Sequence, residues 1–337
     1  MRTALVTGSA GFIGYHLCRR LLDDGFRVIG LDALTDYYDV RLKQRRHSML
    51  RQSQHFQAIE SRLEEPGCLM DLFASEKPDV VVHLAAQAGV RHSIDAPRSY
   101  VEANLVGTFE LLEAARAWRP EHILLASTSS VYGANEEMPY REVHKADTPM
   151  SFYAATKKAN EAMAHSYAHL FDIPTTMFRF FTVYGPWGRP DMALFKFTRA
   201  ILAGEPIDVY NHGEMQRDFT YIDDLVEGIR RLIDASPVRL LDASDVPEGD
   251  SLSPVAPFRI VNIGNSSPVR LMDFIEAIES AIGSKAEKRY MDIQPGDVPA
   301  TWADISLLER LTGFRPGTPV KSGVARFIDW YRDYYKD

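Results

Sequence analysis

The chain of 337 residues is poor in the features that mark disulfide-rich, nucleic-acid-binding and membrane-spanning proteins. Its two cysteines, Cys18 and Cys68, fit neither a disulfide framework nor the ligand spacing of a metal site. No apolar run reaches the length that spans a bilayer, and no basic segment precedes an apolar one at the N-terminus. The net charge of −8 is spread without a basic block. We therefore expect a globular cytoplasmic protein that has no metal and binds neither nucleic acid nor a membrane.

Short apolar runs alternate with amphipathic stretches through the first half of the chain. This alternation predicts an α/β fold, in which helices cover both faces of a doubly wound parallel sheet. A run that is apolar throughout, such as Val80–Val82, suits a strand buried on both faces. The predicted strands are Thr3–Thr7, Arg27–Asp32, Phe56–Ile59, Val80–Ala86, His122–Thr128 and Thr175–Phe181.

After Phe181 the alternation gives way to a stretch punctuated by glycine and proline, which predicts a smaller second domain. The apolar run Arg259–Gly264 is suited to return to the large sheet, so we expect the second domain to be discontinuous. The predicted division assigns residues 1–181, with a return segment at about 218–264, to the large domain. Residues 182–217 and 265–337 form the smaller, C-terminal substrate domain.

Three glycines, Gly8, Gly11 and Gly14, follow the first strand and open a helical stretch. Backbone amides of such a turn, together with the helix N-terminus, can receive a pyrophosphate. Asp32 ends the second strand, where a carboxylate binds the ribose hydroxyls of an adenosine and repels a 2′-phosphate. The pattern favours NAD over NADP. The alternative interpretation of the three glycines is a tight turn that binds no ligand.

Tyr153 and Lys157 lie one helical turn apart, so they share a face from which Lys158 is rotated away. A free tyrosine, with a pKa of about 10, is a poor base near neutrality, but a nearby ammonium and a cationic nicotinamide ring both favour the phenolate. The pair predicts an acid/base couple for hydride transfer. The hydroxyls of Ser127–Ser130 follow another strand, at the sheet edge where such folds bind ligands, although consecutive Ser/Thr residues in one loop are more often turn and capping groups.

Together these residues resemble the extended short-chain dehydrogenase/reductases of the NAD-dependent epimerase/dehydratase family, and within them the UDP-glucuronate 4-epimerases. The resemblance covers essentially the whole chain. It implies a Rossmann-type fold, an NAD cofactor, a UDP-sugar substrate and a homodimer. The implied reaction inverts C4 of UDP-glucuronate and gives UDP-galacturonate, a polysaccharide precursor. The motifs that carry it are the glycine turn, His83–Arg91, Thr128–Gly133, Tyr153 with Lys157, Thr182–Pro186, Arg189–Ala193 and Gln294–Asp297.

The resemblance also implies roles for single residues. Thr128, Tyr153 and Lys157 would be catalytic. The C5 carboxylate of the sugar would lie among Ser129, Ser130 and Thr182, with Arg189 ordering that pocket, and Arg217 would bind the diphosphate. The full substrate set is Thr128, Ser129, Ser130, Thr182, Arg189, Met192, Arg217 and Asp297. The cofactor set is Gly8, Gly11, Phe12, Ile13, Gly14, Asp32, Lys43, Leu63, Ala85, Ala86, Gln87, Asn104, Tyr153 and Lys157.

Two alternatives to the epimerase remain from the sequence. A UDP-glucuronate decarboxylase, forming UDP-xylose or a 4-keto-pentose, would share the cofactor and Tyr153, and a noncatalytic module would bind NAD alone. Ser129 and Ser130 stand where related dehydratases carry Asp-Glu, which disfavours dehydration. Arg62 and Ala33 depart from the residues usual beside the adenine and ribose, and a positive Arg62 could tolerate a 2′-phosphate.

Two further patterns are weaker. Glu161, His165 and His169 recur along one helical face, which we interpret as a polar face or an interface between subunits and not as a metal site. Trp187 is expected to anchor a loop.

Overall fold

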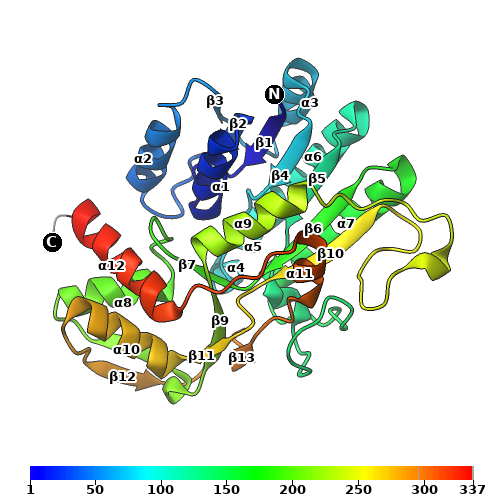
Figure 1. Cartoon of the computed structure of the whole chain (residues 1–337). Coiled ribbons are helices and arrows are strands. Elements are labelled where there is room, and N and C mark those ends of the chain that lie inside the picture. Colours follow the sequence, from blue (N-terminus) through cyan, green and yellow to red (C-terminus); the bar gives the residue numbers. More distant parts are fainter. Residues whose placement is uncertain (295, 336–337) are drawn as a thin grey trace.

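Within residues 1–294 and 296–335, the part of the chain that the computed structural model describes, the largest element is a seven-stranded parallel sheet (Figure 1). Its strand order is β10–β6–β5–β4–β1–β2–β3. The strands are β1 (Thr3–Thr7), β2 (Arg27–Asp32), β3 (Phe56–Glu60), β4 (Val80–His83), β5 (His122–Ala126), β6 (Thr175–Phe180) and β10 (Phe258–Ile263). The predicted α/β fold with a doubly wound parallel sheet is confirmed.

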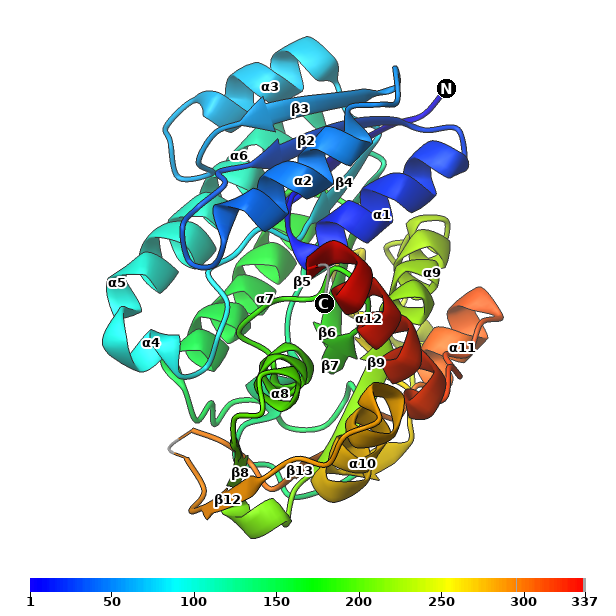
Figure 2. The same cartoon turned by 90° about the vertical axis from the view of Figure 1, so that its left-hand side faces the viewer.

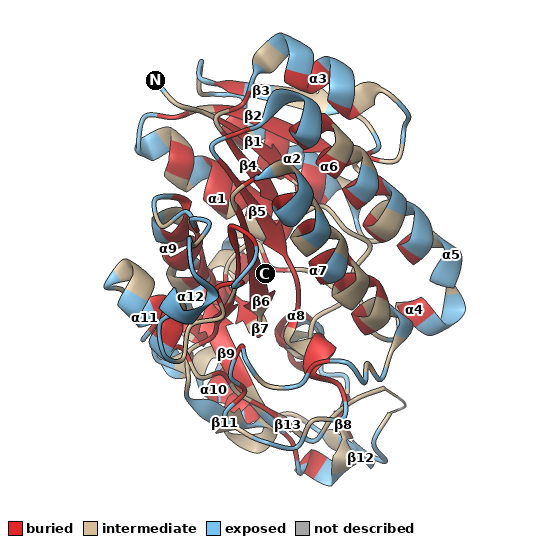
Figure 3. Ribbon diagram, turned by 90° about the vertical axis from the view of Figure 1, so that its right-hand side faces the viewer, coloured by how far each residue is buried: buried red, intermediate tan, exposed pale blue. Residues whose placement is uncertain are grey.

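The core lies on both faces of this sheet because successive strand residues point to opposite sides. In β1, Val6 packs into one hydrophobic cluster and Leu5 into the other, and both side chains are fully buried. Figure 3 shows the sheet strands buried between layers of helices. One layer contains α1 (Phe12–Asp23), α2 (Val40–Leu50) and α9 (Ile222–Ile233). The other contains α3 (Cys68–Glu76), α6 (Gly107–Trp118) and α7 (Phe152–Phe171).

Short helices connect the strand ends on the side where the two parts of the molecule meet. They are α4 (His92–Asp95), α5 (Pro97–Tyr100), the π-helix η1 (Val101–Val106) and the 3-10 helix η2 (Ser129–Tyr132).

The smaller part lies beyond the carboxyl ends of the large sheet (Figure 2). Its central strand β9 (Gln216–Tyr221) pairs with β7 (Thr182–Tyr184), β11 (Pro268–Arg270) and β13 (Ala300–Thr301). A separate parallel pair joins β8 (Ile207–Tyr210) to β12 (Lys288–Met291). The remaining helices are α8 (Ala193–Leu202), η3 (Asn211–Gly213), η4 (Ala243–Asp245), α10 (Leu271–Ile282), α11 (Ser306–Thr312) and α12 (Val320–Tyr335).

Apart from shifts of one residue at the ends of β3, β6 and β10, the structure differs from the expected elements at three places. β4 ends at His83 and β5 ends at Ala126, so both strands are shorter than predicted. Their last expected residues leave the sheet and line a cavity; Thr128, for example, caps η2 by accepting a hydrogen bond from the Ser130 amide at 3.2 Å. The predicted domain boundary at residue 218 falls inside β9, which pairs along its length within the small sheet.

None of the described helices combines the length and the apolar character needed to cross a membrane.

Candidate active site

The turn between β1 and α1 brings the backbone close to its neighbours. Gly8 has a φ of +74°, which L side chains rarely adopt, and a Cβ on Gly14 would lie 2.1 Å from the Gly8 carbonyl oxygen. α1 begins at Phe12, and Gly11 before it has no side chain that could cap the first amides. An open helix N-terminus beside a cradle that a Cβ would fill is suited to a pyrophosphate, so these residues fit NAD.

Two backbone amides hold the carboxylate of Asp32 at the end of β2. Oδ2 accepts from the amide of Ala10 at 3.0 Å, and Oδ1 accepts from the amide of Leu34 at 2.8 Å. Because Ala10 belongs to the glycine turn, the carboxylate and the turn are fixed relative to one another. A pyrophosphate cradle and an acceptor for ribose hydroxyls therefore form one unit.

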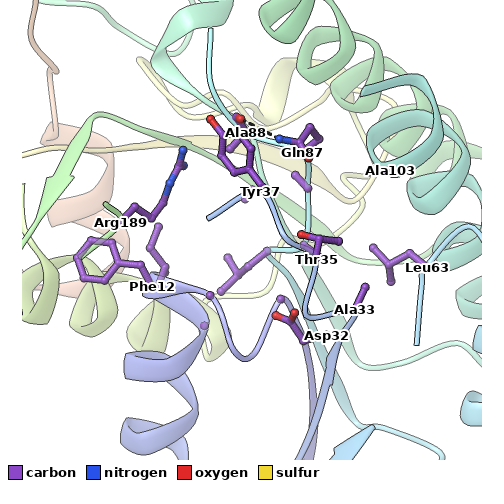
Figure 4. A pocket seen from close by; sticks show the side chains of 18 of the residues that line it. Phe12, Asp32, Ala33, Thr35, Tyr37, Leu63, Gln87, Ala88, Ala103 and Arg189 are labelled. Atoms are coloured by element: carbon purple, nitrogen blue, oxygen red, sulfur yellow. Dashed lines mark hydrogen bonds between the residues drawn. The ribbon is translucent and has the colours of Figure 1, made fainter. Parts of the chain in front are cut away.

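A cavity of about 340 Å³ lies over the carboxyl ends of β1, β2, β4 and β5. Figure 4 shows Phe12, Asp32, Leu63 and Gln87 around it. The predicted cofactor residues in its lining are Gly8, Gly11, Phe12, Ile13, Gly14, Asp32, Lys43, Leu63, Ala85, Ala86, Gln87, Tyr153 and Lys157.

Asn104 supports the wall of this cavity from behind. Its Oδ1 accepts from the amide of Gln87 at 2.8 Å, and its Nδ2 donates to the Gln87 carbonyl oxygen at 3.1 Å. The side chain is almost fully buried. The structure therefore places Asn104 as a residue that shapes the lining backbone, whereas the sequence predicted a cofactor contact.

The adenosine end of the cavity contains the two residues that depart from the family pattern, Ala33 and Arg62. Arg62 Nη1 lies 3.1 Å from Glu64 Oε1, so a carboxylate balances its charge. Lys43 donates to the carbonyl oxygen and the hydroxyl of Thr35 at 2.6 and 3.0 Å, and burial lowers its pKa. At this end Arg62 is paired with Glu64, Lys43 donates to Thr35, and the Asp32 carboxylate would repel a 2′-phosphate.

Tyr153 and Lys157 point into the site from the first turns of α7, which the Ser151 hydroxyl caps at the Ala154 amide. Lys157 Nζ donates to the Ala126 carbonyl oxygen at 2.9 Å, and burial lowers the pKa of Lys157 to about 8. Burial also raises the pKa of Tyr153, while the charge of Arg189 and a hydrogen bond with Thr128 act against that shift.

From the sequence, the tuning of Tyr153 was attributed to the Lys157 ammonium and to a cationic nicotinamide ring. In the structure, the charge of Arg189 and the hydrogen bond with Thr128 oppose the rise of the Tyr153 pKa, and the Lys157 ammonium donates to the Ala126 carbonyl oxygen.

A second cavity, of about 730 Å³, lies between the strand ends and the smaller part of the molecule. It is lined by all the predicted substrate residues: Thr128, Ser129, Ser130, Thr182, Arg189, Met192, Arg217 and Asp297. Thr128, Tyr153, Arg189 and Met192 line both cavities. A molecule in one cavity would therefore meet a molecule in the other beside the Tyr153 phenol.

The far end of the second cavity contains Arg217 and Asp297. Arg217 Nη1 donates to the carbonyl oxygens of Gln216 and Pro299 at 2.9 and 3.2 Å. Asp297 accepts from Arg91 Nη2 at 3.1 Å. Pro295, in the Gln294–Asp297 motif, lies outside the described residues. Arg217 keeps further N–H groups that could bind phosphate oxygens.

Two lining residues, Tyr37 and Asp191, have no role assigned from the sequence. Asp191 accepts two hydrogen bonds from Arg189, and the Tyr37 hydroxyl donates to Asp191 at 3.3 Å. Tyr37 gave no periodic or motif signal. Asp191 was part of a motif, but its contact with Arg189 depends on how the backbone turns between them.

Glu161, His165 and His169 have separate partners along α7. Glu161 accepts from the Ser127 hydroxyl at 2.7 Å and from Arg179 Nε and Nη2, both at 2.9 Å. His165 Nε2 lies 2.8 Å from the Ser253 hydroxyl, and His169 Nδ1 lies 2.7 Å from the Val255 carbonyl oxygen. The buried ion pair with Arg179 holds the segment that leads into Thr128.

The loop that carries Arg189 is tied to both parts of the molecule. Trp187, at a φ of +61°, packs against Tyr15 of α1 and Trp330 of α12, with ring centroids 5.7 and 5.2 Å away. The buried Arg46 of α2 donates through Nη2 to the Trp187 carbonyl oxygen at 2.5 Å and through Nη1 to the Ala10 carbonyl oxygen at 2.9 Å. Arg46 therefore links this loop to the glycine turn.

The fold and the site define a nucleotide-cofactor enzyme of the doubly wound α/β class, with a tyrosine acid/base group where two cavities meet. Residues 4–239 match the model of the NAD dependent epimerase/dehydratase family. The chain belongs to this family.

Relatives with similar sequences and structures agree with this membership. The chain is 55% identical over 332 residues to the probable UDP-glucuronate 4-epimerase of Rhizobium meliloti (strain 1021), which covers 98% of this chain and 97% of that protein. It is 44% identical over 338 residues to UDP-glucuronate 4-epimerase 4 of Arabidopsis thaliana, covering 99% of this chain and 76% of the plant protein. The solved UDP-glucuronic acid 4-epimerase from Bacillus cereus, in complex with UDP-glucuronic acid and NAD, has a TM-score of 0.86 at 32% identity, covering 99% and 100% of the two chains.

Proposed function

We propose that this enzyme inverts C4 of UDP-glucuronate to give UDP-galacturonate through a transient 4-keto sugar, with NAD as its cofactor. The observation that carries the proposal is that Thr128, Tyr153 and Arg189 all line both cavities. A proton-transfer group and a cation for a carboxylate thus lie where cofactor and sugar would meet. Similarity to UDP-glucuronate 4-epimerases over nearly the whole chain supports the same substrate.

When bound, NAD supplies the acceptor that takes hydride from C4 and returns it. Tyr153 removes the O4 proton as C4 becomes a ketone, while Thr128 holds O4 by a hydrogen bond. The keto sugar then turns over, and Tyr153 returns the proton to O4 of the other epimer. The reaction has no net redox change, so the cofactor remains in the same state after each turnover.

The carboxylate on C5 creates a chemical hazard, because the 4-keto sugar is a β-keto acid that can lose CO₂. We assign Arg189 and the hydroxyls of Ser129, Ser130 and Thr182 to this carboxylate, and Arg217 to the diphosphate. Cleavage of the C5–C6 bond moves negative charge away from the carboxylate. Hydrogen bonds that stabilise the charge in place therefore raise the barrier to decarboxylation.

Incubation of the purified protein with UDP-glucuronate, followed by chromatography and NMR of the products, tests the proposal. We expect an equilibrium mixture of UDP-glucuronate and UDP-galacturonate. UDP-xylose or a 4-keto-pentose as the main product would instead establish the decarboxylase. NAD bound by a protein that converts none of the sugar would establish the noncatalytic module.

We further propose a homodimer formed through η1, α6 and the start of α7, which are neighbours in the fold. These helices expose the apolar side chains of Val101, Val106, Phe109 and Phe152. Light scattering after size exclusion should give twice the chain mass, and Phe109→Glu should shift it toward the monomer. Leu241→Glu, at an exposed loop position, is the matched control. A wild-type monomer would contradict this assembly.

We also propose a cytoplasmic location and a role in supplying activated galacturonate for polysaccharides. Both rest on the proposed product, and the free thiols of Cys18 and Cys68 are compatible with a reducing compartment. Cell fractionation tests the location, and the galacturonate content of cell polysaccharide after gene deletion tests the role.

A further inference from the structure

Arg189 is held by a carboxylate of its own chain. Its Nε donates to Asp191 Oδ1 at 3.0 Å, and its Nη2 donates to Asp191 Oδ2 at 2.5 Å. Both of these hydrogen bonds use the edge of the guanidinium that carries Nε, and the Tyr37 side chain also interacts with Arg189. A guanidinium has five N–H donors in a planar fork, so the edge formed by Nη1 and Nη2 still has donors for a second carboxylate.

The ion pair lies in the wall of the site, with about a quarter of each side chain exposed (23% and 27%). Asp191 has a third partner, the Tyr37 hydroxyl, which donates to Oδ2 at 3.3 Å. The Tyr37 ring centroid lies 5.9 Å from the Arg189 guanidinium carbon, and Figure 4 shows both side chains at the same pocket. Since Tyr37 follows β2, Asp191 connects Arg189 to the nucleotide-binding side of the molecule.

We propose that Asp191 is a positioning residue that turns the free edge of Arg189 toward the C5 carboxylate of the substrate, with Tyr37 orienting Asp191. This inference rests on the proposed function and deepens it. Two carboxylates then share one guanidinium, Asp191 on the Nε edge and the sugar on the Nη1 edge. The sugar carboxylate meets donors that are already oriented, so less conformational entropy is lost on binding.

Orientation matters most while C4 is a ketone. Loss of CO₂ at that stage breaks the C5–C6 bond, its electron pair passes into a C4 enolate, and C5 later takes a proton from solvent. A guanidinium that keeps its hydrogen bonds to the carboxylate disfavours this path, because the carboxylate charge that it stabilises is lost when CO₂ leaves. A guanidinium that rotates freely stabilises the carboxylate less well. Asp191 therefore influences which product forms.

A different role is possible for the same contact: Asp191 could imitate the substrate carboxylate and compete for Arg189. The two roles predict opposite effects of Asp191→Asn, which removes the charge and keeps the shape. If Asp191 competes with the substrate, Asp191→Asn would strengthen the selective binding of the sugar carboxylate. If Asp191 positions Arg189, the same substitution would weaken this binding and increase the loss of CO₂.

The experiment compares wild type with Asp191→Asn and has two readouts. The first is the ratio of Kd for UDP-glucose, which lacks the carboxylate, to Kd for UDP-glucuronate, measured calorimetrically with NAD-loaded protein. We expect this ratio to fall about tenfold, the effect of about one charge-assisted hydrogen bond. The second is the amount of decarboxylated product formed per UDP-galacturonate, and we expect this product ratio to rise about tenfold. Tyr37→Phe should also lower the binding ratio and raise the yield of decarboxylated product, each by about threefold, because it removes one neutral hydrogen bond.

The matched control is Asp250→Asn. Asp250 accepts the same fork from Arg259, Nε to Oδ1 at 2.9 Å and Nη2 to Oδ2 at 3.2 Å, in a buried pair outside both cavities. Asp250→Asn should lower the free energy of unfolding without changing either readout. A change that appears only in Asp191→Asn would therefore separate positioning from general destabilisation.

A raised binding ratio in Asp191→Asn would overturn the proposal in favour of competition, and two unchanged readouts would overturn it in favour of a purely structural pair. If wild type formed no UDP-galacturonate, the proposed function would fail, and the binding ratio would still decide the role of Asp191.

Discussion

The two cavities are built in different ways. The cofactor cavity consists largely of backbone and of strand ends that are neighbours in the large sheet, with the glycine turn, Asp32 and the segment after β4 on adjacent strands. The substrate cavity collects side chains from distant segments, from Thr128 after β5 to Asp297 near the C-terminus. Repetition of one strand-turn-helix unit can produce the first cavity. Only correct packing of the small domain produces the second.

This difference separates binding of the common cofactor from recognition of one sugar. A backbone cradle accepts the same pyrophosphate in any chain that forms the turn. In the proposed function the sugar is selected by side chains such as Arg189, whose orientation depends on Asp191 and, through it, on Tyr37. Substitutions should therefore divide into those that affect the cofactor, those that affect the sugar, and those at the boundary.

The largest effect is expected at Tyr153, where the two cavities meet. Tyr153→Phe removes the group that we propose takes and returns the O4 proton, so kcat should fall about 1,000-fold, within the usual range for a lost acid/base group. NAD content should remain at the wild-type value. Tyr167→Phe is the control on the same helix, because the Tyr167 hydroxyl donates to Glu113 at 2.6 Å. Substantial turnover by the Tyr153 variant would remove this residue from the mechanism.

The next largest effect should be confined to the cofactor cavity. In Gly14→Ala the new Cβ would lie 2.1 Å from the Gly8 carbonyl oxygen, so the turn must shift. We expect NAD affinity to fall about 100-fold, a loss typical of steric disruption in a packed site. Gly228→Ala, in helix α9, is the control, since its Cβ would make an ordinary 3.5 Å contact with Ile263 of β10. Unchanged NAD retention by Gly14→Ala would contradict the assignment of the turn.

A smaller effect should appear in both cavities when Arg46, which links the loop of Arg189 to the glycine turn, is replaced. Arg46→Met removes the hydrogen bonds from one guanidinium to Ala10 and Trp187. NAD affinity and the preference for UDP-glucuronate over UDP-glucose should each fall about tenfold, as for a lost charge-assisted hydrogen bond. Isothermal titration measures both. The neighbouring Arg45→Met, at an exposed position, should change neither. An effect on one cavity alone would show that Arg46 does not couple them.

The smallest effect concerns stability beneath the cofactor cavity. His83 is buried between the hydroxyls of Thr7 and Thr108, 2.8 and 3.2 Å from its ring nitrogens. Burial, with a contribution from the charge of Lys157, lowers the pKa of His83 from 6.5 to about 3. Below pH 6.5 the unfolded chain binds a proton that the folded chain does not, so stability falls as pH falls toward about 3.

Urea unfolding checks this at about pH 6.5 and about pH 5.5, where the contribution of His83 should differ by about 1 kcal/mol. His83→Gln should lose that part of the pH dependence, whatever its effect at neutral pH. His55→Gln, at an exposed position, should retain it. Equal pH dependence in wild type and His83→Gln would mean that His83 takes up its proton over the same pH range in the folded and the unfolded protein.

Much of the fold could be predicted because its signals are local. The strand interiors were found from short apolar runs, and β1, β2 and β4 begin where expected. The ends of β4 and β5 were placed too far along, because apolar and small residues continue where the chain already leaves the sheet. Asn104 remains a predicted cofactor residue, and the structure adds that its amide supports the Gln87 backbone, which composition and spacing do not reveal.

By itself the sequence determined the parallel sheet, the glycine turn with its acceptor Asp32, and the placing of Tyr153 and Lys157 on one helical face. Each follows from a spacing of a few residues, set by backbone geometry. Only the tertiary structure decided that Lys157 turns to Ala126, that Arg46 joins the two cavities, and that Tyr37 and Asp191 hold Arg189. These contacts depend on how separate elements pack and how loops turn, and no repeat along the chain encodes them.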